Sequence, residues 1–234
     1  MTYREAINSV LRRLREQTID SDWSGNLYDS NTITDYQKLI GELVNDAKRN
    51  VESYHSWNAL RQTFNIKTQA GLMQYTLGDD DEGSGASFSV LDVINQTTGT
   101  VLTQVPNDWL NAQVFPIDDV VNGEPKHYAF NGVSQAGANR EPDFNIDLYP
   151  VPDAINIISV NVVGASEDLT KADDYLMVPS QPVVLGAWAR AISERGEDGG
   201  SISSVVAAEA RDSLNIAVQL DAGNMEYERD WYVA

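Results

Sequence analysis

The sequence predicts an α+β fold in which helices at both ends of the chain frame a β domain. Apolar residues recur at helical spacing before residue 60 and after Pro179, and between these regions they alternate at a period of two. The chain has 234 residues, 42% hydrophobic and 22% charged, which is enough to bury a core. We therefore expect a four-helix unit, formed by the N- and C-terminal helix pairs, with an inserted antiparallel β-sandwich or barrel.

Two amphipathic helices are predicted in the first 60 residues. The first has one apolar face, formed by Ala6, Ile7, Val10, Leu11 and Leu14. The second begins at an N-cap, Thr34, and keeps helical spacing of apolar residues from Tyr36 to Tyr54. The segment between them, residues 19–31, is rich in Asp, Ser, Gly and Asn and is predicted to be a loop.

Seven short strands are predicted in the middle of the chain, because apolar and polar residues alternate there between turns containing Gly, Pro and Asn. They fall near residues 60–67, 73–77, 88–94, 101–105, 127–130, 144–149 and 155–163. Residues 131–142 are expected to form a long exposed loop.

Two further helices are predicted after Pro179. Pro182 suits the first turn of one helix, and Gly196 suits its C-terminal cap. The last helix is expected to begin at Ser203 or Ser204 and to end at Gly223. Its inward face is predicted to be Val206, Ala210, Leu214, Ala217 and Leu220. The resulting domains are a discontinuous helical domain, 1–59 plus 179–223, an inserted β domain, 60–178, and a C-terminal tail, 224–234.

The charge of the chain is strongly negative and unevenly placed. Sixteen basic and 35 acidic residues give a net charge of −19, which argues against a protein that binds duplex DNA through Lys and Arg. Residues 71–170 contain two basic and fifteen acidic residues. This acidity suits either a solvated surface or a wall that does not bind passing DNA. Asp79, Asp80, Asp81 and Glu82 are the candidate acidic channel or tip loop.

The sequence offers little for catalysis or for binding a cofactor. It has no cysteine and two histidines, His55 and His127, and it lacks nucleophile-elbow, phosphate-loop and dinucleotide motifs. The acids at 79–82 lack the alternating spacing of a calcium loop. The adjacent pairs Asp118–Asp119 and Asp173–Asp174 point apart and are not catalytic dyads. We expect no catalytic residue, metal or cofactor. We also expect no signal peptide or membrane span, and folding in a cytoplasm.

The tail combines aromatic and acidic residues without helical or strand periodicity. Its candidate anchors for a portal or subunit interface are Met225, Tyr227, Trp231 and Tyr232. Alternatively, the tail folds back onto its own domain.

The helical ends resemble the head-to-tail adaptors of tailed bacteriophages, in particular the tail tubular protein A-like adaptors of short-tailed phages. The resemblance lies in the basic helix from Tyr3 to Arg15 and the long helix ending Val51-Glu52-Ser53-Tyr54-His55-Ser56-Trp57. The strand start Leu60-Arg61-Gln62-Thr63-Phe64-Asn65-Ile66 and the late segment Leu185-Gly186-Ala187-Trp188-Ala189-Arg190-Ala191 also carry it. It covers somewhat under half of the chain, and the β domain aligns with nothing.

This resemblance implies a structural virion protein that is assembled in the host bacterial cytoplasm and located in the head–tail neck. Such a protein forms a homo-oligomeric ring, usually twelve-fold, that docks under the portal protein and extends the DNA channel. The ring provides a platform for the tail or nozzle protein, and packaged DNA passes through it without specific binding.

Two other classes of function stay open at this point. One is a glycan- or receptor-binding β-sandwich module of a virion, with exposed Trp109, Tyr128 or Tyr149 as its platform. The other is a hydrolase that uses acidic side chains. Neither explains why helices from both ends of the chain frame the β domain.

Overall fold

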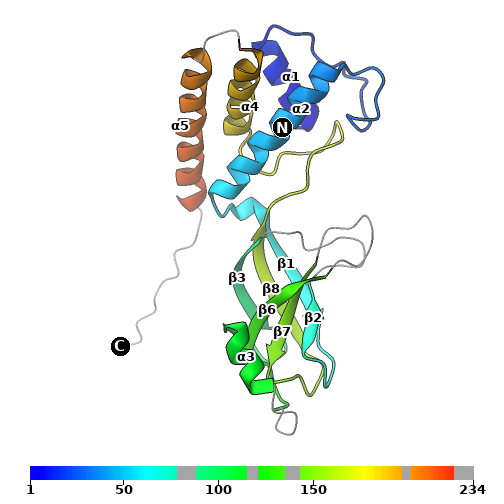
Figure 1. Cartoon of the computed structure of the whole chain (residues 1–234), viewed down its shortest axis with the longest axis vertical. Coiled ribbons are helices and arrows are strands. Elements are labelled where there is room, and N and C mark those ends of the chain that lie inside the picture. The colour runs from blue at the N-terminus through cyan, green and yellow to red at the C-terminus, as the bar shows by residue number, and fades with distance from the viewer. Residues whose placement is uncertain (78–87, 115–120, 135–142, 197–200, 224–234) are drawn as a thin grey trace. The chain divides into compact units, whose positions relative to one another are not determined.

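The computed structural model describes residues 1–77, 88–114, 121–134, 143–196 and 201–223. The described chain is mixed α+β, with five α-helices and two four-stranded sheets, so the predicted class is confirmed. It divides into two compact units (Figure 1). We call residues 1–60 with 166–234 the helical unit, and residues 61–165 the β unit.

The helical unit contains α1 (Tyr3–Arg13), α2 (Asp35–Tyr54), the short 3-10 helix η1 (Asn58–Leu60), α4 (Ser180–Arg195) and α5 (Ser201–Gly223). Helix α4 packs against α1, α2 and α5. The buried side chains of α4 include three consecutive residues, so they lie on more than one side of the helix. Among them are Val183, Val184, Leu185, Ala187 and Ala191. The finer description of this unit as a four-helix unit stays a prediction.

The predicted helix boundaries are largely confirmed. Thr34 caps α2 through a capping box in which Gln37 bonds back to the cap backbone. Pro182 lies in the first turn of α4, and Gly196 ends that helix in the left-handed conformation, with a φ of 65°. Helix α5 begins at Ser201, two or three residues before the predicted start.

The β unit contains two sheets with strand orders β1-β8-β3-β4 and β2-β7-β6-β5. The first is formed by β1 (Arg61–Lys67), β8 (Ile157–Gly164), β3 (Phe88–Asn95) and β4 (Thr100–Val101). The second is formed by β2 (Gln74–Thr76), β7 (Asp143–Tyr149), β6 (His127–Ser134) and β5 (Thr103–Gln104). The chain passes from the first sheet to the second at Leu102, between β4 and β5.

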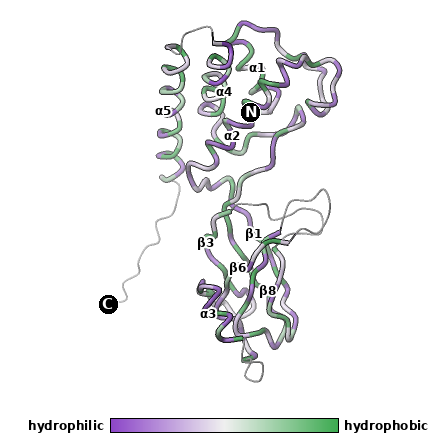
Figure 2. Tube along the Cα trace, viewed as in Figure 1, coloured by the Kyte–Doolittle hydropathy of each residue, from purple (hydrophilic) through white to green (hydrophobic). Residues whose placement is uncertain are grey.

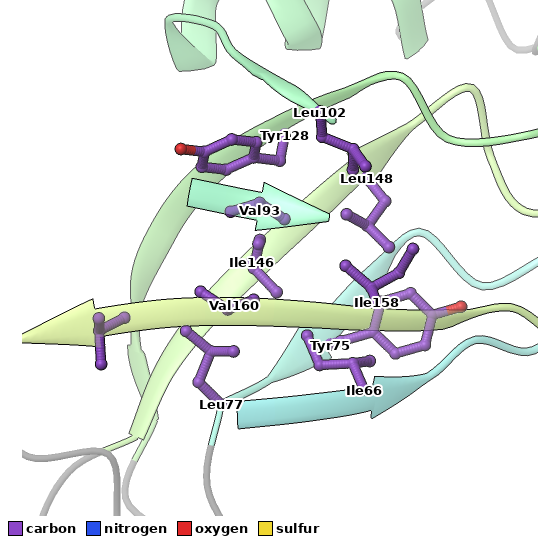
Figure 3. Packing of buried hydrophobic residues seen from close by; sticks show 11 residues of the cluster. Ile66, Tyr75, Leu77, Val93, Leu102, Tyr128, Ile146, Leu148, Ile158 and Val160 are labelled. Atoms are coloured by element: carbon purple, nitrogen blue, oxygen red, sulfur yellow. The ribbon is translucent and has the colours of Figure 1, made fainter. Parts of the chain in front are cut away.

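Side chains from both sheets contribute to one hydrophobic cluster (Figure 3). Ile66, Val93, Ile158 and Val160 come from the first sheet, and Tyr75, Tyr128, Ile146 and Leu148 come from the second, joined by Leu77 and Leu102. The alternation in β7 explains its contribution, because Ile146 and Leu148 share one face of the strand. The arrangement as a sandwich or barrel stays a prediction.

Strand β6 continues to Ser134, so the first four residues of the exposed loop expected at 131–142 belong to a strand. Two other features of the β unit also differ from the sequence-based expectation. Helix α3 (Asn107–Val114) was not predicted, and its Leu110 packs in a small cluster with Ala129 and Tyr149. Strands β5 and β6 pair in parallel, whereas an antiparallel sheet was expected. The two differences are linked, because a parallel pair needs a crossover connection and α3 lies in the segment between β5 and β6.

Residues 166–178 lie in the helical unit, whereas the sequence-based boundary assigned them to the β domain. They have no regular periodicity, but Leu169, Ala172 and Val178 are buried. Backbone bonds tie the segment to the N-terminus, since the Tyr3 N–H donates to the Asp174 carbonyl (2.8 Å) and the Leu27 N–H to the Thr170 carbonyl (2.8 Å).

Asp147 in β7 is a buried carboxylate with incomplete hydrogen bonding. Its Oδ2 accepts from Asn131 Nδ2 (2.7 Å), but its Oδ1 is buried without a hydrogen-bond partner in the described chain. Burial raises the pKa of the Asp147 carboxyl above its ordinary value of 3.8, and the side chains of Asn131 and Gln74 lower it only in part. The folded state therefore holds this proton more tightly than the unfolded state.

Asp147→Asn is expected to stabilise the protein at neutral pH by about 1 kcal/mol, because it removes an incompletely bonded buried charge. The charge penalty is fully present above the raised pKa and disappears as the pH falls toward 3.8. Thermal melting of both proteins at several pH values checks this. A stabilisation that does not shrink with falling pH would show that charge is not its cause.

Candidate assembly surface

The residues chosen from the sequence as candidate sites lie outside the described residues. This applies to Asp79, Asp80, Asp81 and Glu82 and to Met225, Tyr227, Trp231 and Tyr232. Their roles stay predictions. Among the described residues, a groove and an exposed apolar face lie on α5 and the helices beside it.

In the described part of the chain, no group of three or more His, Cys, Asp or Glu side chains converges to hold a metal ion. Asp174 has a structural role, since its Oδ2 accepts from the backbone N–H groups of Thr170 (2.8 Å) and Lys171 (2.7 Å). No described helix is both long and apolar enough to cross a membrane.

The proposed aromatic platform for glycans is not present as an exposed set. Tyr128 and Tyr149 are only 5% and 9% exposed, and Trp109 is 38% exposed. Trp109 packs edge-on against His127 and Tyr149, with ring centroids 5.1 and 5.7 Å apart. These rings therefore stabilise the contact of α3 with its sheet.

A buried lysine fixes α2 to the segment that returns to the helical unit. Lys48 Nζ donates to the carbonyls of Ser166 (2.8 Å) and Glu167 (2.7 Å) and to Ser166 Oγ (2.9 Å). It also pairs with Glu52 (3.4 Å), which accepts a hydrogen bond from Ser166 Oγ. Asn45, one turn earlier, donates to the Leu169 carbonyl (2.9 Å). These bonds hold α2 in a fixed position beside the other helices.

Helix α5 lies beside α4 (Figure 1) and is anchored at its C-terminal end. His55 Nε2 lies 3.1 Å from Asp221 Oδ2, which also accepts from the Asn58 backbone N–H (3.2 Å). His55 packs edge-on against Trp57, with ring centroids 5.0 Å apart. His55 thus holds α5 in place, which accounts for it without a catalytic role.

A groove of about 760 Å³ lies between α2, α4 and α5. Its walls are mostly small or apolar, including Ala47 and Val51 from α2, Ala189 from α4, and Ala210 and Leu214 from α5. At one side, Tyr54 Oη donates to Asn215 Oδ1 (3.4 Å). Arg190 and Arg211 also line the groove, and no described Asp or Glu does.

The two groove arginines have no ion-pair partner among the described residues. Arg190 lies over the groove wall, with Nη1 3.4 Å from where a Cβ on Gly186 would be. By contrast, Arg195 near the end of α4 is fully engaged, bonding Tyr36 Oη (2.7 Å) and Glu16 Oε1 (2.5 Å). The groove therefore combines apolar walls with uncompensated positive charge, in a chain of net charge −19.

The other notable surface is an exposed apolar face of α5. It carries Ile202, Val205, Ile216 and Leu220, which are 55%, 59%, 59% and 68% exposed. Their separations of 3, 11 and 4 residues place them on one side of the helix. Figure 2 shows hydrophobic residues recurring along the length of α5. We call these four residues the outer face of α5.

The prediction that Leu220 faces inward is wrong. The helix packs mainly on α4, so it buries only one narrow face, where Val206 is buried and Ala207 and Ala210 are partly covered. Leu220 lies outside that contact. A set of large apolar side chains left exposed on one helix face is typical of a protein–protein interface.

Together, the mixed α+β fold and the exposed apolar face of α5 indicate a protein that contacts other proteins. The comparison with protein families agrees. The chain matches the family model described as SU10 adaptor protein over residues 1–230, and it belongs to this family. The resemblance to phage head-to-tail adaptors is thereby confirmed, and the chain is a phage structural adaptor rather than a member of an enzyme family. No curated protein matches the sequence.

Proposed function

We propose that the chain is the subunit of a homo-oligomeric ring, of about twelve copies by analogy with the adaptors it resembles, in the neck between phage head and tail. In this proposal the ring is assembled in the host bacterial cytoplasm, docks under the portal protein and extends the DNA channel. It also gives the tail or nozzle protein its attachment platform. The family membership supports an adaptor role, and the exposed outer face of α5 is the observation that carries the assembly part.

A closed ring needs two different patches on each subunit, because its contacts are heterologous. We assign one of these patches to the outer face of α5, which supplies four large apolar side chains on a single helix. The portal contact would come from the tail anchors Met225, Tyr227, Trp231 and Tyr232. That the two ends of the chain form one folding domain, with the β domain inserted between them, is part of the same proposal, with the second boundary moved from 178/179 to 165/166.

The acidity of the chain suits this role. Residues 71–170, including the acidic segment Asp79–Glu82, carry most of the excess negative charge. A channel wall or tip with this charge would repel packaged DNA, so the DNA would slide without binding. The charge is also the reason that we do not propose a nucleic-acid-binding function.

The deciding experiment is the particle mass of the purified chain, alone and mixed with the portal protein of its own phage, by light scattering and negative-stain imaging. We expect either a ring alone or a monomer that forms a ring on the portal. A chain that stays monomeric and ignores the portal would contradict the proposal.

Deleting residues 224–234 is expected to weaken portal attachment while the fold survives, because the deletion begins after the last residue of α5. Co-sedimentation of portal with full-length and truncated chain measures the effect, and circular dichroism checks the fold. Equal portal binding by the two proteins would remove the tail from the portal interface.

A further inference from the structure

We infer that the groove between α2, α4 and α5 binds the C-terminal segment, residues 224–234, of the same chain in the free subunit. The inference names a binding site for the tail and so deepens the proposed function. Three features carry it: the charge of the groove, the character of its walls and the length of the segment.

The charges are complementary. The groove is lined by Arg190 and Arg211 and by no carboxylate of the described residues, although the chain has more than twice as many acidic as basic residues. The segment 224–234 contains three acids, Glu226, Glu228 and Asp230, and one arginine. Binding would therefore give the two groove arginines the partners that the described residues do not provide.

The shape and polarity of the groove also match the side chains of the segment 224–234. Ala47, Gly186, Ala189 and Ala210 are small, so the walls leave space for large side chains between the helices. The segment supplies such side chains in Tyr227, Trp231 and Tyr232 and in Met225. Large aromatic side chains that fill apolar pockets supply much of the free energy of protein interfaces.

The segment is long enough to reach its own groove. It follows directly after Gly223, the last residue of α5, and Ala210 lies 13 residues earlier in the same helix. That separation is about 20 Å along the helix axis. Eleven extended residues span up to about 36 Å. Because the segment is tethered, its effective concentration at the groove is on the order of millimolar, which favours its own groove over that of a dilute second copy.

The consequence is that the tail anchors are covered until an assembly partner displaces them. A free subunit would then keep Trp231 and Tyr232 out of contact with other proteins, and portal binding would require their release. Only this consequence rests on the proposed function; the groove contact can be tested without a portal.

The absence of cysteine allows a direct test in the full-length chain. Val233→Cys is combined either with Ala210→Cys, in the groove, or with Glu209→Cys, exposed on α5 outside it. The two helix positions are neighbours, so the segment can reach both. With glutathione disulfide as the oxidant, which is reduced to two glutathione thiols, and micromolar protein, we expect the Ala210 pair to form the intramolecular disulfide about tenfold faster than the Glu209 pair. This corresponds to a preference of about 1.4 kcal/mol.

Equal rates for the two pairs would overturn the inference, and so would disulfide-linked dimers as the main product, because the groove would then be taking the tail of a second copy. In the protein that carries Val233→Cys and Ala210→Cys, adding Arg190→Glu and Arg211→Glu should slow cross-linking about fivefold. The comparison requires that the added substitutions leave the melting temperature unchanged. An unchanged rate would exclude these arginines as the charge partners. If cross-linking is selective but no ring forms, the proposed function falls and the groove contact stands.

Discussion

Replacing Lys48 with alanine is expected to lower the free energy of unfolding by about 3–5 kcal/mol, the usual cost of breaking a buried ion pair by removing one partner. The ammonium group is fully buried and donates to two backbone carbonyls and the Ser166 hydroxyl. Without it, the Glu52 carboxylate stays buried with its negative charge unpaired. Urea unfolding of both proteins, followed by circular dichroism, measures the loss.

Arg49→Ala is the matched control, because it removes a cation from the next position on the same helix. Arg49 also has two acidic partners, Asp46 and Asp168, but its side chain is half exposed. Solvent screening reduces such pairs, so we expect a loss of about 1 kcal/mol or less. Similar losses for the two variants would contradict the structural role assigned to Lys48.

A second variant separates charge from packing. Lys48→Met with Glu52→Leu replaces the ion pair with apolar side chains and leaves no uncompensated charge. We expect this double variant to recover at least about half of the stability that Lys48→Ala loses. A double variant as unstable as the single one would show that the hydrogen bonds to Ser166 and Glu167, rather than the pairing of Glu52, dominate the effect.

The helices at the two ends of the chain were predictable because their capping residues indicate the same helix boundaries that the structure has. Thr34 and Gly196 are residue types that suit helix ends at any site, and both cap a helix in the structure. Helix α3 was missed because it has only eight residues and buries a single leucine, Leu110. A stretch of two turns gives too short a pattern to distinguish from a loop.

The position of residues 166–178 could not be predicted from local pattern. Its buried residues Leu169 and Ala172 are hydrogen-bonded to residues far away in the sequence, Asn45 and Arg4. The spacing of apolar residues shows which side chains share a face, but it does not show which other part of the chain packs against that face. The same limit explains Leu220. Its helical spacing with Val206 was correct, but α4 covers only one narrow face of α5, which includes Val206 and leaves Leu220 exposed.

The groove was also beyond a sequence-based prediction. Its lining comes from three separate stretches, near residues 47–54, 182–190 and 207–215, and each stretch alone has the composition of an ordinary helix. Arg190 and Arg211 become notable only when they are found in the same groove, whose described lining contains no carboxylate. The tail anchors were recognised from composition, but what they bind depends on surfaces that only the fold brings together.

Placing two glutamates on the outer face of α5, through Ile216→Glu with Leu220→Glu, is expected to abolish ring assembly while leaving the fold intact. Both side chains are more than half exposed, so their replacement costs the isolated subunit little stability. In an interface, by contrast, two buried and unpaired carboxylates would cost several kcal/mol, which is a loss of about 100-fold or more in affinity. Particle mass by light scattering, alone and with the portal, measures the effect.

The control is Ala208→Glu with Gln219→Glu, which adds two carboxylates to exposed positions on another side of the same helix. Assembly by this control, together with loss of assembly by the outer-face variant, would localise the contact to Ile216 and Leu220 rather than to the net charge of α5. If both variants assemble normally, the subunit interface lies elsewhere, and the outer face of α5 must contact a different component. If neither assembles, added negative charge in a chain of net charge −19 is itself the obstacle, and raising the salt concentration should then restore both.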